Sequence, residues 1–223
     1  MKKLLVVCLL LGFYSTQAQT WRLNGYAYYV FDDKVDNYAT STNYYNTTIR
    51  GGLVWGGGLE YMLHNVYGVE FNYLRQDTKA PTSYYNAGDQ HGDFDVAINW
   101  LLLNFNRYQH FNEKVEGYGG LGLGAAIFDV KRPNNGGSGS ATKFAWQFKL
   151  GVNIFASPKF AIKLQTNLQS AVQSVGGTLY FGSGGGGAGV GTYSSMLQWG
   201  LGGGIVIPFG HPSTQQHHTA PNQ

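Results

Sequence analysis

The chain has 223 residues, and only 12% of them are Asp, Glu, Lys or Arg, whereas an average soluble domain carries about 25% charged residues. Glycine occurs 33 times, and Phe, Trp and Tyr together make up 15% of the chain. The longest apolar run, Leu4–Leu11, is far shorter than the roughly 18 residues that a transmembrane helix needs. The composition therefore excludes a helical membrane protein and argues against a protein of long helices, but it leaves other membrane proteins open.

Residues 1–18 have the features of a secretory signal peptide. Two lysines precede the apolar run Leu4–Phe13, and small residues flank Gln17 before a predicted cleavage after Ala18. The alternative is a lipoprotein signal at Cys8, which lacks the small residue needed before it and lies within the apolar run. Cleavage leaves an exported, nearly neutral chain without its single cysteine, so we expect no thiol chemistry and no nucleic-acid partner.

The remaining chain alternates apolar side chains with small or polar ones. In residues 143–154, for example, the even positions are apolar and the odd ones are small, polar or charged. This period indicates strands, and about ten residues is enough to cross a bilayer at a tilt. Eight strands are predicted, in chain order: Trp21–Phe31, Ile49–Tyr61, Val66–Gln76, Phe94–Phe105, Lys114–Phe128, 143–154, 160–172 and Ser195–Phe209.

The connections between these strands alternate between short and long. The short ones are Met62–Asn65, Asn106–Glu113 and Ala156–Lys159, and the long ones are Asp32–Thr48, Asp77–Gly92, Asp129–Thr142 and Gln173–Ser194. We therefore predict an all-β, eight-stranded antiparallel transmembrane up-and-down β-barrel over residues 19–210, with short periplasmic turns and long extracellular loops. A soluble β-sandwich or lipocalin-like barrel is the alternative. It would need the glycine-rich strand faces to serve as its solvent surface.

Two glycine-rich strands carry a family resemblance, Gly52–Tyr61 and Gly117–Gly124. Together with the signal peptide and the eight predicted strands, they make the chain resemble the outer-membrane β-barrel family of OmpA-type and OmpX-type barrels and opacity proteins. The resemblance implies location in the outer membrane of a Gram-negative bacterium, with the N-terminus in the periplasm after signal cleavage. It also implies outer-membrane lipid and lipopolysaccharide as partners.

The last strand resembles the assembly signal of such barrels, which implies the barrel assembly machinery as a further partner. The residues that carry this resemblance are Gly204, Ile207 and Phe209. The chain departs from the pattern at Gly202, where a polar residue is usual, and in the tail 211–223, which we expect to be disordered. The cleavage region Gln17–Gln19 is similar to that common in Bacteroidetes.

An eight-stranded barrel has an interior just wide enough for side chains or one small ligand. The strand period directs charged residues into it, Asp95 and Lys143 toward the outer end among them, and we predict an ion-pair network that closes the lumen. A gated narrow channel is the alternative. On the network hypothesis, Glu70→Ala or Glu116→Ala lowers thermal stability and raises any single-channel conductance. The predicted network is Arg22, Glu60, Glu70, Glu116, Lys149, Lys163 and Arg50.

The sequence offers no convincing catalytic or metal site. Ser83, His91, Asp93 and Asp95 could be imagined as a lipid hydrolase at the outer rim, but a solvated loop histidine explains the pattern better. A dinucleotide-like glycine pattern lies inside a predicted strand, the glycine run Gly184–Gly191 lacks the end of a phosphate loop, and the histidines of the tail are expected to be solvated. We therefore expect no enzyme activity, no cofactor and no bound metal.

Aromatic residues divide between the lipid face and the long loops. We expect Trp55, Trp100, Trp146 and Trp199 on the lipid face. Amphipathic aromatic residues in the loops favour surface recognition, and these candidates are Tyr44, Tyr45, Tyr84, Tyr85, Tyr180 and Phe181. The leading hypothesis is a structural barrel whose loops adhere to or recognise an extracellular ligand or host surface. A narrow channel or transporter for a small or hydrophobic solute, and a lipid-modifying enzyme, remain as alternatives.

Overall fold

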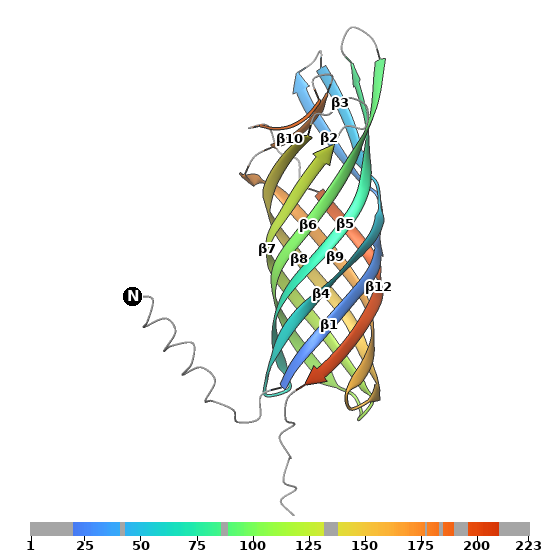
Figure 1. The fold of residues 1–223 in the computed structure, drawn as a ribbon, viewed down its shortest axis with the longest axis vertical. Coiled ribbons are helices and arrows are strands. Elements are labelled where there is room, and N and C mark those ends of the chain that lie inside the picture. The colour runs from blue at the N-terminus through green and yellow to red at the C-terminus, as the bar shows by residue number, and fades with distance from the viewer. Residues whose placement is uncertain are drawn as a thin grey trace, which may run out of the picture.

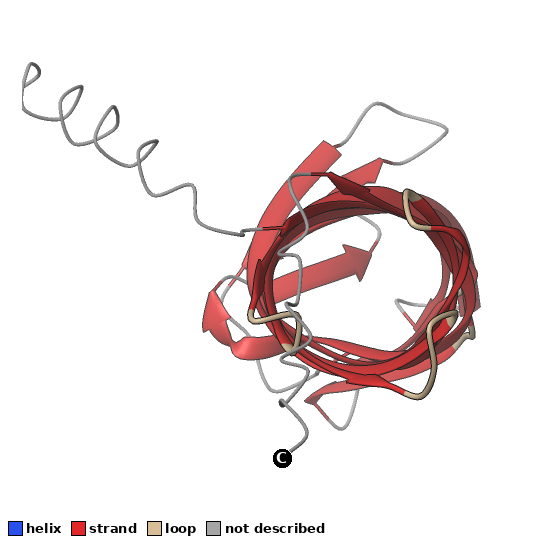
Figure 2. Ribbon diagram, turned by 90° about the horizontal axis from the view of Figure 1, so that it is seen from below, coloured by secondary structure: helices blue, strands red, loops and turns tan. Residues whose placement is uncertain are grey.

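The computed structural model describes residues 20–40, 43–85, 89–131, 138–176, 178–182, 185–189 and 196–209. The predicted signal peptide and C-terminal tail lie outside these ranges. Within them, no helix is long and apolar enough to cross a membrane. The described residues form a cylinder of tilted strands, which is seen from the side in Figure 1 and as a closed ring in Figure 2.

Twelve strands make up the described chain, and eight of them form the barrel. The barrel strands are β1 (Thr20–Val30), β4 (Gly52–Leu63), β5 (Tyr67–Tyr85), β6 (Asp89–His110), β7 (Val115–Lys131), β8 (Ser138–Ser157), β9 (Phe160–Gly176) and β12 (Met196–Phe209). Each pairs antiparallel with its neighbours, and β12 pairs with β1 to close the ring. The prediction of a closed eight-stranded antiparallel barrel is confirmed.

Short turns join the strands at one end of the barrel. Between β4 and β5, His64 and Asn65 have positive φ angles of 52° and 55°, and the Val66 amide donates a hydrogen bond to the Leu63 carbonyl at 3.2 Å. This is the geometry of a two-residue type I′ hairpin turn, whose twist matches that of the strands. In the β6–β7 turn, the Asn112 side-chain oxygen accepts two backbone hydrogen bonds of 2.8 Å each.

At the opposite end, strands extend far into the segments predicted as loops. The predicted loop Asp77–Gly92 is mostly a continuation of β5 and β6, with only residues 86–88 outside the described chain. The first long connection contains the hairpin β2 (Asp33–Thr40) and β3 (Asn43–Ile49), and the last contains β10 (Thr178–Gly182) and β11 (Gly185–Gly189). The composition of these segments predicted loops, but they are partly strands, because Tyr and Thr also favour strands.

The predicted strand Ile49–Tyr61 is wrong at its start, because the strand is interrupted at Arg50 and Gly51, between β3 and β4. The Gly51 amide donates to the Asp32 carboxylate at 2.7 Å, and a Cβ on Gly51 would overlap the Val30 carbonyl oxygen. The interruption resets the alternation, so that Ile49 is buried, although an unbroken strand would place it on the same outward face as Leu53 and Trp55. Arg50 is exposed, which corrects its predicted place in the lumen network.

Over the lower part of the barrel, apolar side chains point outward and polar ones inward. Leu103, Phe71 and Trp55 are 59%, 55% and 49% exposed although they belong to regular strands. Glycine and polar residues occupy the alternate, inward positions, as in β4, where Gly56, Gly58 and Glu60 follow one another. This arrangement is the reverse of a soluble barrel and fits an outer wall that meets hydrocarbon.

Toward the long hairpins the arrangement inverts, with apolar residues inside and polar residues outside. In β6, Phe94, Val96, Ile98 and Trp100 are fully or almost fully buried, whereas Asp95 points outward and is exposed. These placements correct two expectations, Trp100 on the lipid face and Asp95 in the lumen. The physical reason is that water favours polar residues on an exposed wall, so the apolar side chains of this part of the barrel point inward.

Candidate functional site

Six of the predicted charged residues lie together inside the lower half of the barrel. They are contributed by β1, β4, β5, β7, β8 and β9, at inward positions of the strand alternation. None is more than 5% exposed. The set contains three carboxylates and three cations, namely Glu60, Glu70, Glu116, Arg22, Lys149 and Lys163. Buried charges require partners, and the structure shows what those partners are.

Glu70 is at the centre of this cluster. Its carboxylate forms an ion pair with the Lys149 amine at 2.5 Å and accepts a hydrogen bond from the Tyr26 hydroxyl at 2.5 Å. The Asn24 amide donates a third bond to Glu70 at 2.9 Å. These contacts come from strands on both sides of the lumen, so the carboxylate ties opposite walls together.

Glu60 lies beside Glu70, as its register partner on the adjacent strand β4. Its carboxylate accepts hydrogen bonds from the Asn106 amide at 2.6 Å and the Tyr108 hydroxyl at 2.7 Å. Asn24 spans the two carboxylates, because its amide also donates to Glu60 at 3.1 Å. Neutral donors therefore hold two acidic side chains side by side, with the cations of the cluster offsetting their repulsion.

Lys163 contacts polar and aromatic groups instead of a carboxylate directly. Its amine donates to the Asn24 side-chain oxygen at 3.1 Å and to the Tyr26 hydroxyl at 3.3 Å. The same nitrogen lies 4.9 Å and 4.8 Å from the ring centres of Tyr26 and Tyr118. Ring faces attract cations at this distance, and the attraction grows when water is excluded.

Arg22 and Glu116 form a second, bidentate pair nearer the short turns. The two guanidinium nitrogens donate to the two carboxylate oxygens at 2.8 Å and 3.0 Å. Asn153 donates to the same carboxylate at 2.8 Å, and the half-exposed His110 approaches it at 3.0 Å. The guanidinium also lies 4.7 Å from the centre of the Tyr108 ring, which links this pair to the Glu60 group.

An apolar layer covers the polar cluster on the side of the long hairpins. It packs around two large aromatic side chains, Trp100 and Phe128, which are almost entirely buried, with Val30, Leu74 and Val130. Lys143, predicted toward the outer end of the lumen, lies here with its amine 5.4 Å from the Phe128 ring centre. The described lumen thus contains two layers of buried side chains, one polar and one apolar.

Sequence reasoning missed several members of the polar cluster. Tyr26, Tyr108, Asn24 and Asn106 hold the carboxylates, yet aromatic residues were assigned to loops and to the lipid face. The strand alternation could have revealed them, because Asn24 and Tyr26 follow Arg22 at every second position of β1 and therefore point to the same side of the wall. Among the described residues, no cluster of three or more His, Cys, Asp or Glu could hold a metal ion.

The remaining predicted site residues lie near the two ends of the barrel strands. The recognition candidates Tyr44, Tyr45, Tyr84, Tyr85, Tyr180 and Phe181 lie in β3, β5 and β10, and their side chains fall outside the described part. Ser83 and His91 are register partners on β5 and β6. In β12, the assembly-signal residues Gly204, Ile207 and Phe209 pair with Tyr26, Leu23 and Trp21 of β1, so they form the closing seam.

The closed eight-stranded antiparallel barrel defines the class of fold. Neisserial surface protein A is similar, with a TM-score of 0.54 and 14% identity over 86% of this chain and 98% of its own. Outer membrane protein OprG from Pseudomonas aeruginosa has a TM-score of 0.55 and 14% identity over 87% of this chain and 98% of its own. At such identities the likeness shows the fold alone. No family model and no curated protein matches the sequence.

Proposed function

We propose that this protein is an integral outer-membrane β-barrel with a side-chain-filled lumen, and that its long hairpins face outward for adhesion or recognition. The outward apolar band supports insertion in lipid, and the short turns support a periplasmic lower end. Insertion would require the barrel assembly machinery, and the wall would contact outer-leaflet lipid and lipopolysaccharide. The matched structures come from Neisseria and Pseudomonas and lend no support to a Bacteroidetes source.

The observation that carries the proposal is that buried side chains lie in two successive layers within the lumen. The polar cluster joins opposite walls through Glu70 and Glu116, and the apolar layer around Trp100 lies above it. The β10–β11 hairpin adds contacts with β5, β7 and β8 at the outer end. Such a barrel is a rigid support for outward hairpins, and recognition then falls to the hairpins.

Cell adhesion tests the recognition function. Replacing Tyr44, Tyr45, Tyr84 and Tyr85 together with Ser is expected to lower the binding of cells expressing the protein to a host-cell or matrix surface. The matched control replaces Tyr61 and Tyr67 with Ser. Both lie beside the short β4–β5 turn at the other end of the barrel, so binding should be unchanged. Equal adhesion of both variants and the wild type, at equal surface expression, would reject the recognition role.

A narrow channel is the second candidate, and one observation favours it. Within the described part of the chain, the side-chain amides of Gln76, Asn104, Asn167 and Gln198 have no hydrogen-bond partner although they are buried in the lumen. Unpaired amides are costly unless water or a solute reaches them. Planar-bilayer recordings separate the candidates, because a filled lumen gives no conductance steps. Steps that Gln198→Leu abolishes would establish the channel instead.

A further inference from the structure

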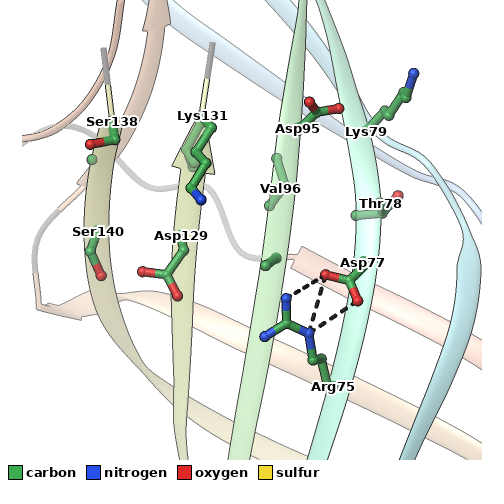
Figure 3. Close-up of a pocket in the computed structure, with 13 residues that line it drawn as sticks. Arg75, Asp77, Thr78, Lys79, Asp95, Val96, Asp129, Lys131, Ser138 and Ser140 are labelled. Carbon is green, nitrogen blue, oxygen red and sulfur yellow. Dashed lines mark hydrogen bonds and ion pairs between the residues drawn. The ribbon is translucent and has the colours of Figure 1, made fainter. Parts of the chain in front are cut away.

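The outer wall carries a polar groove near the long hairpins, where β5, β6, β7 and β8 lie side by side (Figure 3). Its volume is about 680 Å³. The strand registers arrange its lining in rows across the four strands. One row is Lys79, Asp95, Lys131 and Ser138, and the next is Asp77, Ala97, Asp129 and Ser140.

The groove is hollow because Ala97 separates two longer acidic side chains. Asp77 and Asp129 are its register partners on either side, and neither is directly opposed by a bulky residue on β6. Ser138 and Ser140 border the groove on β8 with hydroxyl groups. The result is a concave surface lined by charged and hydroxyl side chains together with Val96, Ala97 and Val130.

The charges lining the groove are balanced, but only some of them are paired. Arg75 and Asp77 form an ion pair at 2.7 Å, and the Asn99 amide donates to Asp129 at 3.2 Å. In the part of the chain that the structure describes, the side chains of Lys79, Asp95 and Lys131 form no hydrogen bond or ion pair. Figure 3 shows the Arg75 guanidinium extending from β5 toward β6, and the Lys131 amine pointing along the groove.

The groove lies at the height where the outer wall changes from apolar to polar. Immediately below it, outward positions hold Tyr73 on β5 and Leu101 on β6, and above these come Arg75 and Asn99. A charged side chain facing hydrocarbon is costly, whereas the headgroup layer solvates it. A molecule bound in this groove would therefore sit among the headgroups of the outer leaflet.

We propose that this groove binds the phosphorylated sugar headgroup of an outer-leaflet glycolipid. Lys131 supplies an unpaired amine that binds phosphate oxygens, since charge-assisted hydrogen bonds are the strong ones. Arg75 adds the N–H groups that its bonds to Asp77 and Asn99 leave unused. Asp129 and Ser140 are register partners in the row next to that of Lys131, and they would accept hydrogen bonds from sugar hydroxyls. The inference rests on the proposed outer-membrane location, which it deepens by assigning a lipid site, and it is independent of recognition by the hairpins.

Lipid binding to the purified full-length mature protein in detergent tests this assignment, with native mass spectrometry as the readout. The probes are bisphosphorylated lipid A, the same lipid A without phosphates, and soluble glucosamine 1-phosphate. Lys131→Gln and Arg75→Gln should each weaken binding of bisphosphorylated lipid A by about tenfold or more. Lys114→Gln, an exposed lysine beside the β6–β7 turn at the other end, is the matched control and should bind as the wild type does.

The probes also distinguish the source of the phosphosugar. Tight binding of lipid A and weak binding of glucosamine 1-phosphate would support a lipid headgroup, and the reverse order would overturn the lipid assignment. Equal binding of phosphorylated and phosphate-free lipid A, or equal loss in Lys114→Gln and Lys131→Gln, would overturn the groove itself. Each variant is first checked for the folded, heat-modifiable form, and none of these outcomes alters the adhesion test.

Discussion

At the scale of single residues, the lumen shows how costly charges are made compatible with a narrow interior. Glu70 is fully buried, yet Lys149, Tyr26 and Asn24 all bind its carboxylate. Desolvation of such a pair largely cancels its attraction, so the pair contributes little net stability. Removing only one member of the pair lowers the stability strongly, because the remaining buried charge then has no counter-ion.

We expect Glu70→Ala to lower the free energy of unfolding by about 3 to 5 kcal/mol, because Lys149 is left buried without its carboxylate. Urea unfolding followed by circular dichroism measures the change. Glu113→Ala, at an exposed turn position, is the control and should change little. The double variant Glu70→Leu with Lys149→Met should recover part of the loss. A double variant less stable than Glu70→Ala would contradict this account.

Room for Glu60 depends on a glycine in the neighbouring strand. A Cβ on Gly68 would overlap the Glu60 carboxylate, so Gly68→Ala should cost about 1 to 3 kcal/mol through displacement of a hydrogen-bonded side chain. Gly52→Ala is the control, since its Cβ would meet its nearest neighbour at an ordinary 3.4 Å. Chemical unfolding of both variants measures the difference, and equal stability would show that the carboxylate adapts.

At the scale of elements, β6 combines two environments in one strand. Near the long hairpins, β6 directs apolar residues such as Ile98 and Trp100 into the lumen. Nearer the short turns, it directs Asn104 and Asn106 into the lumen. A single strand thus belongs to a polar outer wall at one end and to an apolar outer wall at the other. The change occurs without a break in the register with β5 or β7.

Trp100→Ala should therefore destabilise the barrel by about 3 to 5 kcal/mol, as expected for a large aromatic removed from a packed core. Trp55→Ala removes the same side chain from the outward face, where it is 49% exposed, and should cost less. Thermal unfolding in one detergent compares the two. If Trp55→Ala proved the more destabilising, the inversion along β6 would be wrong.

The alternation of residues 143–154 and 160–172 was enough to predict strands and, with the alternating connections, the barrel. Parity also placed Glu70, Glu116 and Lys163 correctly inside the barrel. Alternation cannot reveal where a strand breaks, and Arg50 was misplaced because Gly51 interrupts the pairing. Nor can it reveal which side meets lipid, so Trp100 was assigned by hydrophobicity to the wrong face.

At the scale of the whole molecule, the barrel consists of two stacked zones that share the same strands. The lower zone has a polar interior and an apolar wall, and the upper zone has an apolar interior and a polar wall that carries the groove of Figure 3. The upper zone is built like a soluble barrel and, in the proposed outer-membrane location, would raise the hairpins above the lipid surface. This division accounts for the low overall charge, since much of the outer wall carries apolar side chains.

The pair formed by Arg22 and Glu116 also constrains the order of assembly. β1 and β7 are four strands apart in either direction around the ring, so their side chains meet only after the sheet has curled fully. A flat sheet entering lipid would carry its inward charges without counter-ions, at roughly 2.5 to 3.5 kcal/mol for each one near the bilayer centre. In the proposed outer-membrane location, curling and neutralisation therefore precede or accompany entry into the bilayer, and a half-inserted open sheet is the state that such a chain must avoid.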